Sequence, residues 1–157
     1  MARFTEAMRR CAEAGAPEGV RFAIEPLNRY ETDLIHSAAE GLAFLDRVDM
    51  ENVGLLLDTF HMNIEEPCIP ETLRASGDRT FHVHLADSNR WYPGAGHLDF
   101  TAVVRSLEEL RYDGYLSGEF LPQPDADTAA QRGLATMRPL LNVNSTGMQG
   151  REPDKSE

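Results

Sequence analysis

Four short apolar runs recur at similar intervals along the chain, and stretches with apolar residues at helical spacing separate them. Strands buried in a parallel sheet read as short apolar runs, whereas amphipathic helices repeat apolar residues at every third or fourth position. The pattern therefore predicts parallel β/α units in an α/β fold. The predicted strands are Val20 to Ile24, Val53 to Leu57, Phe81 to Leu85 and Tyr115 to Gly118.

Helical periodicity, capping residues and turn residues place helices around these strands. Two prolines and two adjacent acidic residues predict a loop from Asn63 to Pro70. The predicted helices are a first one that ends at Gly15, then Thr32 to Val48, a short one over Glu71 to Ala75, one capped by Asp99, and Asp125 to Leu141.

The length of 157 residues is enough to bury one core, so we expect a single domain over residues 1–141. From Asn142 to Glu157 the chain has no periodic apolar positions, which predicts a disordered tail. No stretch approaches the roughly 20 apolar residues that span a bilayer, and the first residues interleave charges where a signal peptide has an apolar block. We therefore expect a cytoplasmic protein.

The formal net charge is -11, which disfavours a nucleic-acid surface and favours neutral or cationic partners. The two cysteines, Cys11 and Cys68, lie far apart and have no metal-type spacing. Neither a disulfide framework nor a zinc ribbon is indicated.

An acidic or imidazole residue stands at the downstream end of each predicted strand, and the four are Glu25, Asp58, His84 and Glu119. The carboxyl ends of parallel strands meet at one edge of a sheet, where catalytic groups gather in β/α folds. Alternation along each strand puts these four on one face, opposite the apolar set that packs under the helices. In the third strand, the predicted apolar set is Phe81, Val83 and Leu85.

Three carboxylates and one imidazole in a closed space repel one another unless a cation lies among them. Oxygen donors with a single nitrogen and no thiolate suit manganese, magnesium or cobalt. The pattern therefore predicts a divalent metal site made by the four side chains.

Three segments carry further polar residues just after the predicted strands. They are Ile24-Glu25-Pro26-Leu27-Asn28-Arg29-Tyr30-Glu31, Leu57-Asp58-Thr59-Phe60-His61-Met62-Asn63, and His82-Val83-His84 through Asn89-Arg90 to Pro93-Gly94-Ala95-Gly96. In their order and spacing these segments resemble the sugar phosphate isomerase/epimerase family of xylose isomerase-like TIM barrels. Within that family they are most similar to the ketose 3-epimerases that act on D-tagatose and D-psicose.

The resemblance implies that Glu25, Asp58, His84 and Glu119 bind the metal, which is usually manganese in the family. It implies that the substrate, a ketose, is contacted by Glu31, His61 and Arg90. The implied reaction inverts the carbon next to the ketose carbonyl through a metal-stabilised enediolate, with Glu25 and Glu119 as the acid/base pair. Because the sequence has no obvious phosphate-binding glycine loop, we expect an unphosphorylated sugar.

Three alternatives stay open. A single base on one side of the intermediate favours an aldose-ketose, or hydroxypyruvate-type, isomerase reaction. The chain is also compatible with a half-barrel that binds metal without catalysis. A relation to barrel-shaped endonucleases that act on abasic DNA is disfavoured by the strong acidity.

The resemblance covers only the C-terminal half of the family barrel. A (β/α)₈ barrel needs roughly 250 residues, and this chain has room for about four β/α units. A half-barrel leaves two sheet edges and its inner face open. We expect a homodimer that completes the barrel, with the last strand of one copy against the first strand of the other.

Overall fold

Four parallel strands form one sheet in a computed structural model that describes residues 1–141. The tail predicted from Asn142 to Glu157 lies outside the described residues. The strands lie side by side in sequence order and are β1 (Phe22–Ile24), β2 (Val53–Asp58), β3 (Thr80–Leu85) and β4 (Tyr115–Gly118). This order confirms the predicted α/β fold of consecutive parallel β/α units.

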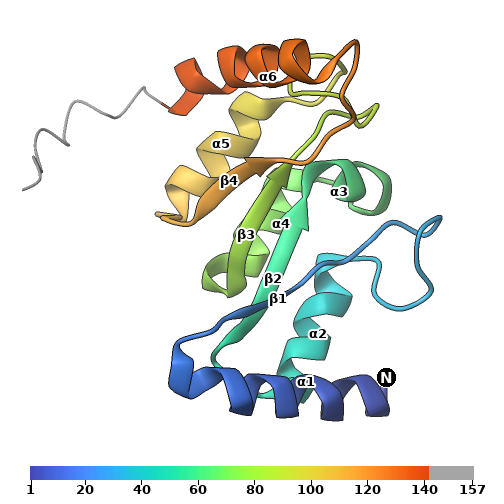
Figure 1. Ribbon diagram of the computed structural model, residues 1–157, viewed down its shortest axis with the longest axis vertical. Helices are drawn as coiled ribbons and strands as arrows, with labels where there is room; N and C mark the ends of the chain where they lie inside the picture. The colour runs from blue at the N-terminus through green and yellow to red at the C-terminus, as the bar shows by residue number, and fades with distance from the viewer. Residues whose placement is uncertain (142–157) are drawn as a thin grey trace, which may run out of the picture.

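One helix precedes the first strand, the others follow strands in the chain, and three of them cover one face of the sheet. The helices are α1 (Ala2–Gly15), α2 (Ala38–Val48), α3 (Thr59–Glu65), α4 (Ile69–Ser76), α5 (Phe100–Glu109) and α6 (Ala126–Leu141). Helices α2, α4 and α5 lie along the sheet, whereas α1 and α6 lie at opposite ends of the molecule (Figure 1). The covered face is called the outer face below, and the opposite one the inner face.

The core lies between the outer face and these helices. Leu55 and Leu57 of β2 and Val83 of β3 are almost completely buried, and Phe44 of α2 packs into the same cluster. Burial of a large apolar side chain stabilises the fold by about 1.5–3 kcal/mol, so this layer supplies the main driving force for the half-barrel. The strands are consequently held with their carboxyl ends at one edge.

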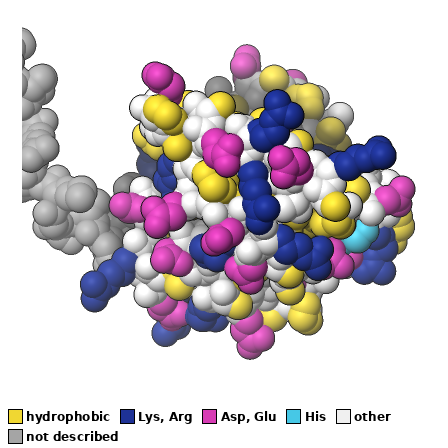
Figure 2. Space-filling view, turned by 90° about the horizontal axis from the view of Figure 1, so that it is seen from below, with side chains coloured by type: hydrophobic (Ala, Val, Ile, Leu, Met, Phe, Trp, Pro, Cys, Tyr) yellow, Lys and Arg dark blue, Asp and Glu magenta, His cyan; other side chains and the backbone are white. Residues whose placement is uncertain are grey.

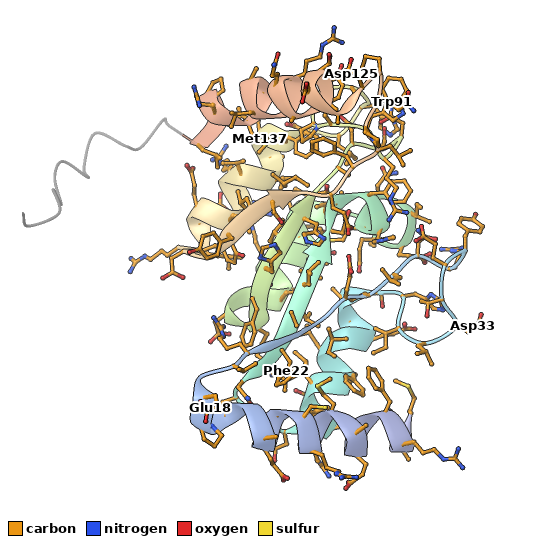
Figure 3. All side chains as sticks on the ribbon, in the orientation of Figure 1. Glu18, Phe22, Asp33, Trp91, Asp125 and Met137 are labelled. Carbon is orange, nitrogen blue, oxygen red and sulfur yellow. The ribbon has the colours of Figure 1, made fainter. Side chains whose placement is uncertain are left out.

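Helix α2 begins later than the sequence predicted. Thr32 and Asp33 lie in the loop before the helix, and Asp33 is seen at the tip of this loop in Figure 3. The N-cap is Ser37, whose side-chain oxygen accepts the backbone N–H of Glu40 at 3.2 Å. Several polar residues in this segment are acceptable caps, and only the packing of the loop decides among them.

No helix was predicted between β2 and the loop expected from Asn63 to Pro70. In the structure α3 extends into that segment and α4 begins at Ile69, so the loop is limited to residues 66–68. The Asp58 side chain caps α3 by accepting the backbone N–H of Phe60 at 2.6 Å. The acidic pair in the predicted loop has structural partners: Glu65 binds Arg29 in the loop after β1, and Glu66 accepts the backbone N–H of Ala38 at 2.7 Å. These contacts tie the end of α3 to the loop after β1 and to the start of α2.

Phe81 faces the inner side of the sheet, although its predicted place was in the outward apolar set. The pairing of β2 with β3 shifts register between Leu55 and Leu56, so β3 has an additional residue at this point. A Cβ added to Gly54 would collide with the Phe81 ring, and the Arg21 guanidinium stacks 3.5 Å from the centre of that ring. A bulge reverses the alternation of side chains, and alternation alone does not reveal it.

The inner face and both edges of the sheet are not covered by the described residues. Strands β1 and β4 each pair with a single neighbour in the sheet. The Tyr115 side chain, at the start of β4, is 81% exposed.

On the face shown in Figure 2, acidic and basic side chains are interspersed with apolar ones. Within residues 1–141, no helix has the length and apolar character needed to cross a membrane.

Candidate metal centre

The four side chains predicted to bind a metal meet at the carboxyl edge of the sheet. Glu25 directly follows β1, Asp58 ends β2, His84 lies in β3, and Glu119 directly follows β4. Each of them offers one ligand atom, and these four atoms lie within 4.8 Å of one another. Residues from four separate strands converge because parallel pairing aligns Asp58 with His84, and His84 with Ser117 two positions before Glu119.

The His84 ring lies between the carboxylates. Its Nδ1 atom is 3.2 Å from Glu119 Oε2, 3.7 Å from Glu25 Oε1 and 3.8 Å from Asp58 Oδ2. Three of these ligand atoms, Glu25 Oε1, Asp58 Oδ2 and His84 Nδ1, are buried and have no hydrogen-bond partner in the described chain. Buried polar atoms normally have partners, so this arrangement fits a bound cation.

The charges at the centre oppose one another. Burial, followed by the negative charges of Glu119 and Asp58, raises the pKa of Glu25 to about 7. Burial likewise raises the pKa of Asp58, whose side chain is 1% exposed. Carboxylates that are buried together resist ionisation unless a positive charge is near. A divalent cation is the partner that this donor set fits, and three oxygens with one imidazole nitrogen suit manganese, magnesium or cobalt.

Glu31, His61 and Arg90, which the resemblance assigned to the substrate, form a linked group beside the centre. Glu31 and Arg90 make an ion pair of 2.7 Å between Oε1 and Nη1. Glu31 Oε1 also accepts a hydrogen bond of 2.9 Å from Asn28 Nδ2. The same amide nitrogen lies 2.8 Å from His61 Nδ1. Glu31 and Arg90 come from the loops after β1 and β3, and His61 comes from α3 after β2, so only the folded sheet brings them together.

The loop that carries Arg90 is organised by Asp87, which is completely buried. Its carboxylate accepts the backbone N–H groups of Ser88, Gly94 and Leu98 at 2.7–3.1 Å. Burial acts to raise the pKa of Asp87, but the hydrogen bonds from the backbone N–H groups outweigh it, so the pKa is lowered overall. Arg90 itself has a left-handed backbone with φ of 61°, and its side chain donates to Glu31.

Two aromatic or imidazole residues near the site have structural partners. His82 Nε2 lies 2.7 Å from Ser117 Oγ on β4, so this ring has a hydrogen-bond partner on the neighbouring strand. Tyr92 is buried, and its hydroxyl accepts a hydrogen bond from Arg132 of α6 at 2.9 Å. Tyr92 therefore anchors the loop to α6. Trp91, its neighbour, is seen at the α6 end of the molecule in Figure 3.

Asn28 is the residue of this site that the sequence analysis did not single out. Its amide connects His61 with Glu31, and its side chain is 1% exposed. An asparagine in a loop most often serves a turn, and Asn28 also does so by accepting the backbone N–H of Tyr30. Nothing in the local sequence distinguishes that role from the long-range contact with His61.

Comparison with known proteins gives a consistent picture. The sequence pattern of the family described as xylose isomerase-like TIM barrel matches residues 1–140. An L-ribulose 3-epimerase from Methylomonas sp. is 39% identical over 134 residues, which are 85% of this chain and 47% of that protein. A D-psicose 3-epimerase from Ruminiclostridium cellulolyticum is 40% identical over 112 residues, which are 71% of this chain and 38% of that protein.

A solved structure agrees in fold. The crystal structure of a D-allulose 3-epimerase from Methylomonas sp. superposes with a TM-score of 0.83 and 34% sequence identity. The superposition covers 88% of this chain and 55% of that one. The chain thus spans about half the length of the relatives that it matches.

Proposed function

The chain belongs to the xylose isomerase-like TIM barrel family, and on that premise we propose that it acts as a metal-dependent sugar epimerase. The proposed reaction inverts the carbon next to the carbonyl of a ketose. The observation that carries the proposal is the convergence of Glu25, Asp58, His84 and Glu119, with three of their ligand atoms buried and unpartnered in the described chain. Relatives named as L-ribulose and D-psicose 3-epimerases support a ketose as substrate.

The proposed metal ligands are these same four residues, and the proposed metal is manganese, with magnesium or cobalt as alternatives. A bound divalent cation supplies a Lewis acid that polarises the carbonyl and the neighbouring hydroxyl of the sugar. The protein contributes a preformed set of donors from four strands. A bound cation relieves the repulsion among these carboxylates.

Glu25 and Glu119 are the proposed acid/base pair. A carboxylate can act as a general acid or base, and Glu25 Oε1 lies at the centre, 3.7 Å from His84 Nδ1. One carboxylate removes the proton from the carbon, and the other returns a proton to the opposite side of the planar enediolate. Because the two residues stand at β1 and β4, the two outermost strands of the sheet, they approach the sugar from different directions.

Glu31, His61 and Arg90 are the proposed sugar contacts. Burial lowers the pKa of His61, so its ring is neutral at pH 7 and offers one N–H donor. The Arg90 guanidinium is a permanent cation and can donate to sugar oxygens and to the enediolate. Its pairing with Glu31 holds it over the loops at the carboxyl edge of the sheet.

A metal-binding but inactive half-barrel is the second candidate. One observation favours it: the chain matches only about half the length of its relatives. A complete barrel has four further β/α units, which form part of the pocket, and these are not among the described elements of this chain. We propose that a second copy completes the barrel, because β1 and β4 each have an unpaired edge in the described sheet. An aldose-ketose isomerase is the remaining alternative.

Nuclear magnetic resonance of sugars in heavy water separates these functions. The manganese-loaded protein is incubated with L-ribulose, D-psicose or D-tagatose, and product sugars are identified after the metal is removed. The proposal expects inversion at C3 with a deuteron in place of the C3 proton, and loss of this activity in Glu119→Gln. Aldose products would instead establish an isomerase, and tight manganese binding without turnover would establish the inactive half-barrel.

A further inference from the structure

The Asn28 side chain is held in one orientation by three hydrogen bonds. Its Oδ1 accepts the backbone N–H of Tyr30 at 2.9 Å, and its Nδ2 lies 2.9 Å from Glu31 Oε1 and 2.8 Å from His61 Nδ1. An amide group has two N–H donors and one carbonyl acceptor, so this set uses both hydrogens and the oxygen. The reverse orientation would set Oδ1 against the Glu31 carboxylate, so it is excluded by electrostatics.

The contacts of Asn28 determine which His61 nitrogen carries the proton. His61 Nδ1 faces the Asn28 amide nitrogen and also the backbone N–H of Asn28 at 3.3 Å. Both groups only donate, so Nδ1 must act as the acceptor, and the single proton of the neutral ring lies on Nε2. Nε2 is buried and has no partner among residues 1–141. His61 lies in the first turn of α3, the helix that the Asp58 side chain caps, so the ring is close to the metal centre.

We propose that Asn28 is a positioning residue that holds His61 as the Nε2–H tautomer, so that a hydrogen-bond donor faces a substrate oxygen. The sugar contact rests on the proposed function, whereas the tautomer is a property of the protein alone. The opposite tautomer would present a lone pair at Nε2, which cannot donate to an oxygen that gains negative charge during reaction. The single amide of Asn28 also contacts Glu31, the partner of Arg90, and so aligns all three proposed sugar contacts.

The test reads the tautomer directly, in protein labelled with ¹⁵N at histidine. Two-bond proton-nitrogen correlations are recorded with and without magnesium, which is diamagnetic, and His61→Gln assigns the His61 signals. The expected wild-type result is a pyridine-type shift at Nδ1 and a pyrrole-type shift at Nε2. In Asn28→Asp the carboxylate presents an acceptor to Nδ1, so Nδ1 is expected to carry a proton. Either the two shift types exchange, or both nitrogens are protonated.

Kinetics and metal binding complete the test. Asn28→Asp is expected to lower kcat/KM by about 10- to 100-fold, the effect typical of removing a side chain that orients a functional imidazole. Its manganese affinity should stay within about twofold of wild type, because Asn28 contacts none of the four proposed ligands in the described structure. The matched control is Asn63→Asp, which adds the same charge on α3 at a partly exposed position.

Each outcome decides one question. A wild-type spectrum with a protonated Nδ1, or an Asn28→Asp spectrum like that of wild type, overturns the inference whatever the activity. The expected spectra without turnover overturn the proposed function and leave the role of Asn28 in selecting the tautomer standing. If Asn28→Asp does not fold by circular dichroism, Asn28→Ala replaces it, with averaged tautomer shifts as the expected result and an unchanged spectrum as the contrary one.

Discussion

At the scale of single residues, the two carboxylate oxygens of Asp58 have different surroundings. Oδ1 accepts the backbone N–H of Phe60 and so begins α3, whereas Oδ2 is buried with no partner within the described chain. Oδ2 lies 3.8 Å from His84 Nδ1. The same side chain therefore connects the start of a helix with the proposed metal, which explains why an acidic residue is suited to this strand end.

Replacing Asp58 by asparagine separates these two roles. The new amide side chain should keep the cap, since its carbonyl oxygen can still accept the Phe60 N–H, but the negative charge at the centre is gone. Asp58→Asn should weaken manganese binding by more than about 100-fold, since removal of a side chain that merely orients a ligand already costs about 10- to 100-fold. Isothermal titration calorimetry measures this, with the exposed Asp113→Asn as control. Equal affinity in the two variants would refute the assignment of Asp58 as a ligand.

The raised pKa of Glu25 predicts how pH affects the metal-free protein. Burial, then the charges of Glu119 and Asp58, raise this pKa from 4.5 to about 7, so the folded protein binds more protons than the unfolded chain between these values. The contribution of Glu25 to stability should then fall as pH rises from about 4.5 to about 7, by on the order of 3 kcal/mol.

Urea denaturation at several pH values in the presence of a chelator tests this. Manganese should remove most of the loss at pH 7, because the cation offsets the repulsion, and Glu25→Gln should show a shallower fall than wild type. A metal-free protein whose stability rises steadily from about pH 4.5 to about pH 7 would contradict the expected desolvation of Glu25.

At the scale of elements, the strands were predicted more accurately than the segments between them. Strand β4 has the predicted bounds, and β2 and β3 each differ by one residue, because a buried strand is read directly from its apolar run. Strand β1 was predicted from Val20 but begins at Phe22. The start of α2 and the existence of α3 depend instead on which side chain caps the helix, Ser37 and Asp58 respectively. The bulge at Phe81 depends on pairing with β2 and has no local signature.

Leu55 offers a test of how far the β2 layer stabilises the fold. Its side chain is completely buried on the outer face, and Leu55→Ala should lower the free energy of unfolding by about 2–5 kcal/mol. Leu34→Ala is the matched control, since this leucine is 60% exposed in the loop before α2, and its effect should stay within about 0.5 kcal/mol. Chemical denaturation of both variants gives the comparison. Similar losses in the two would show that the core lies elsewhere.

At the scale of the whole molecule, the sheet ends in two edges that the described residues do not pair. Exposed strand edges tend to pair with another chain. Two copies related by a two-fold axis along the barrel would set β4 of each against β1 of the other and keep all eight strands parallel. The same pairing would cover the inner face, where Tyr115 is exposed.

Mass in solution and metal content test this assembly together. Light scattering during gel filtration should give twice the chain mass of 17.5 kDa, with one manganese ion for each copy. In the dimer, the carboxylates of both copies would lie at the same end of the barrel and repel one another when the metal is removed. Chelation should therefore shift the protein towards the monomer, and high salt should weaken that shift by screening the repulsion. A monomer that binds manganese fully would exclude the homodimer and leave the metal site intact.

The sequence by itself determined the α/β class, the approximate positions of the four strands, and the four residues that stand at the strand ends. These features follow from local periodicity and from the rule that parallel strands end at one edge. Only the tertiary structure decided that Glu25, Asp58, His84 and Glu119 approach within 4.8 Å, that Phe81 turns to the inner face, and that Asn28 contacts His61. These depend on register and on contacts between loops of different β/α units, and a linear pattern of residues does not encode such distances.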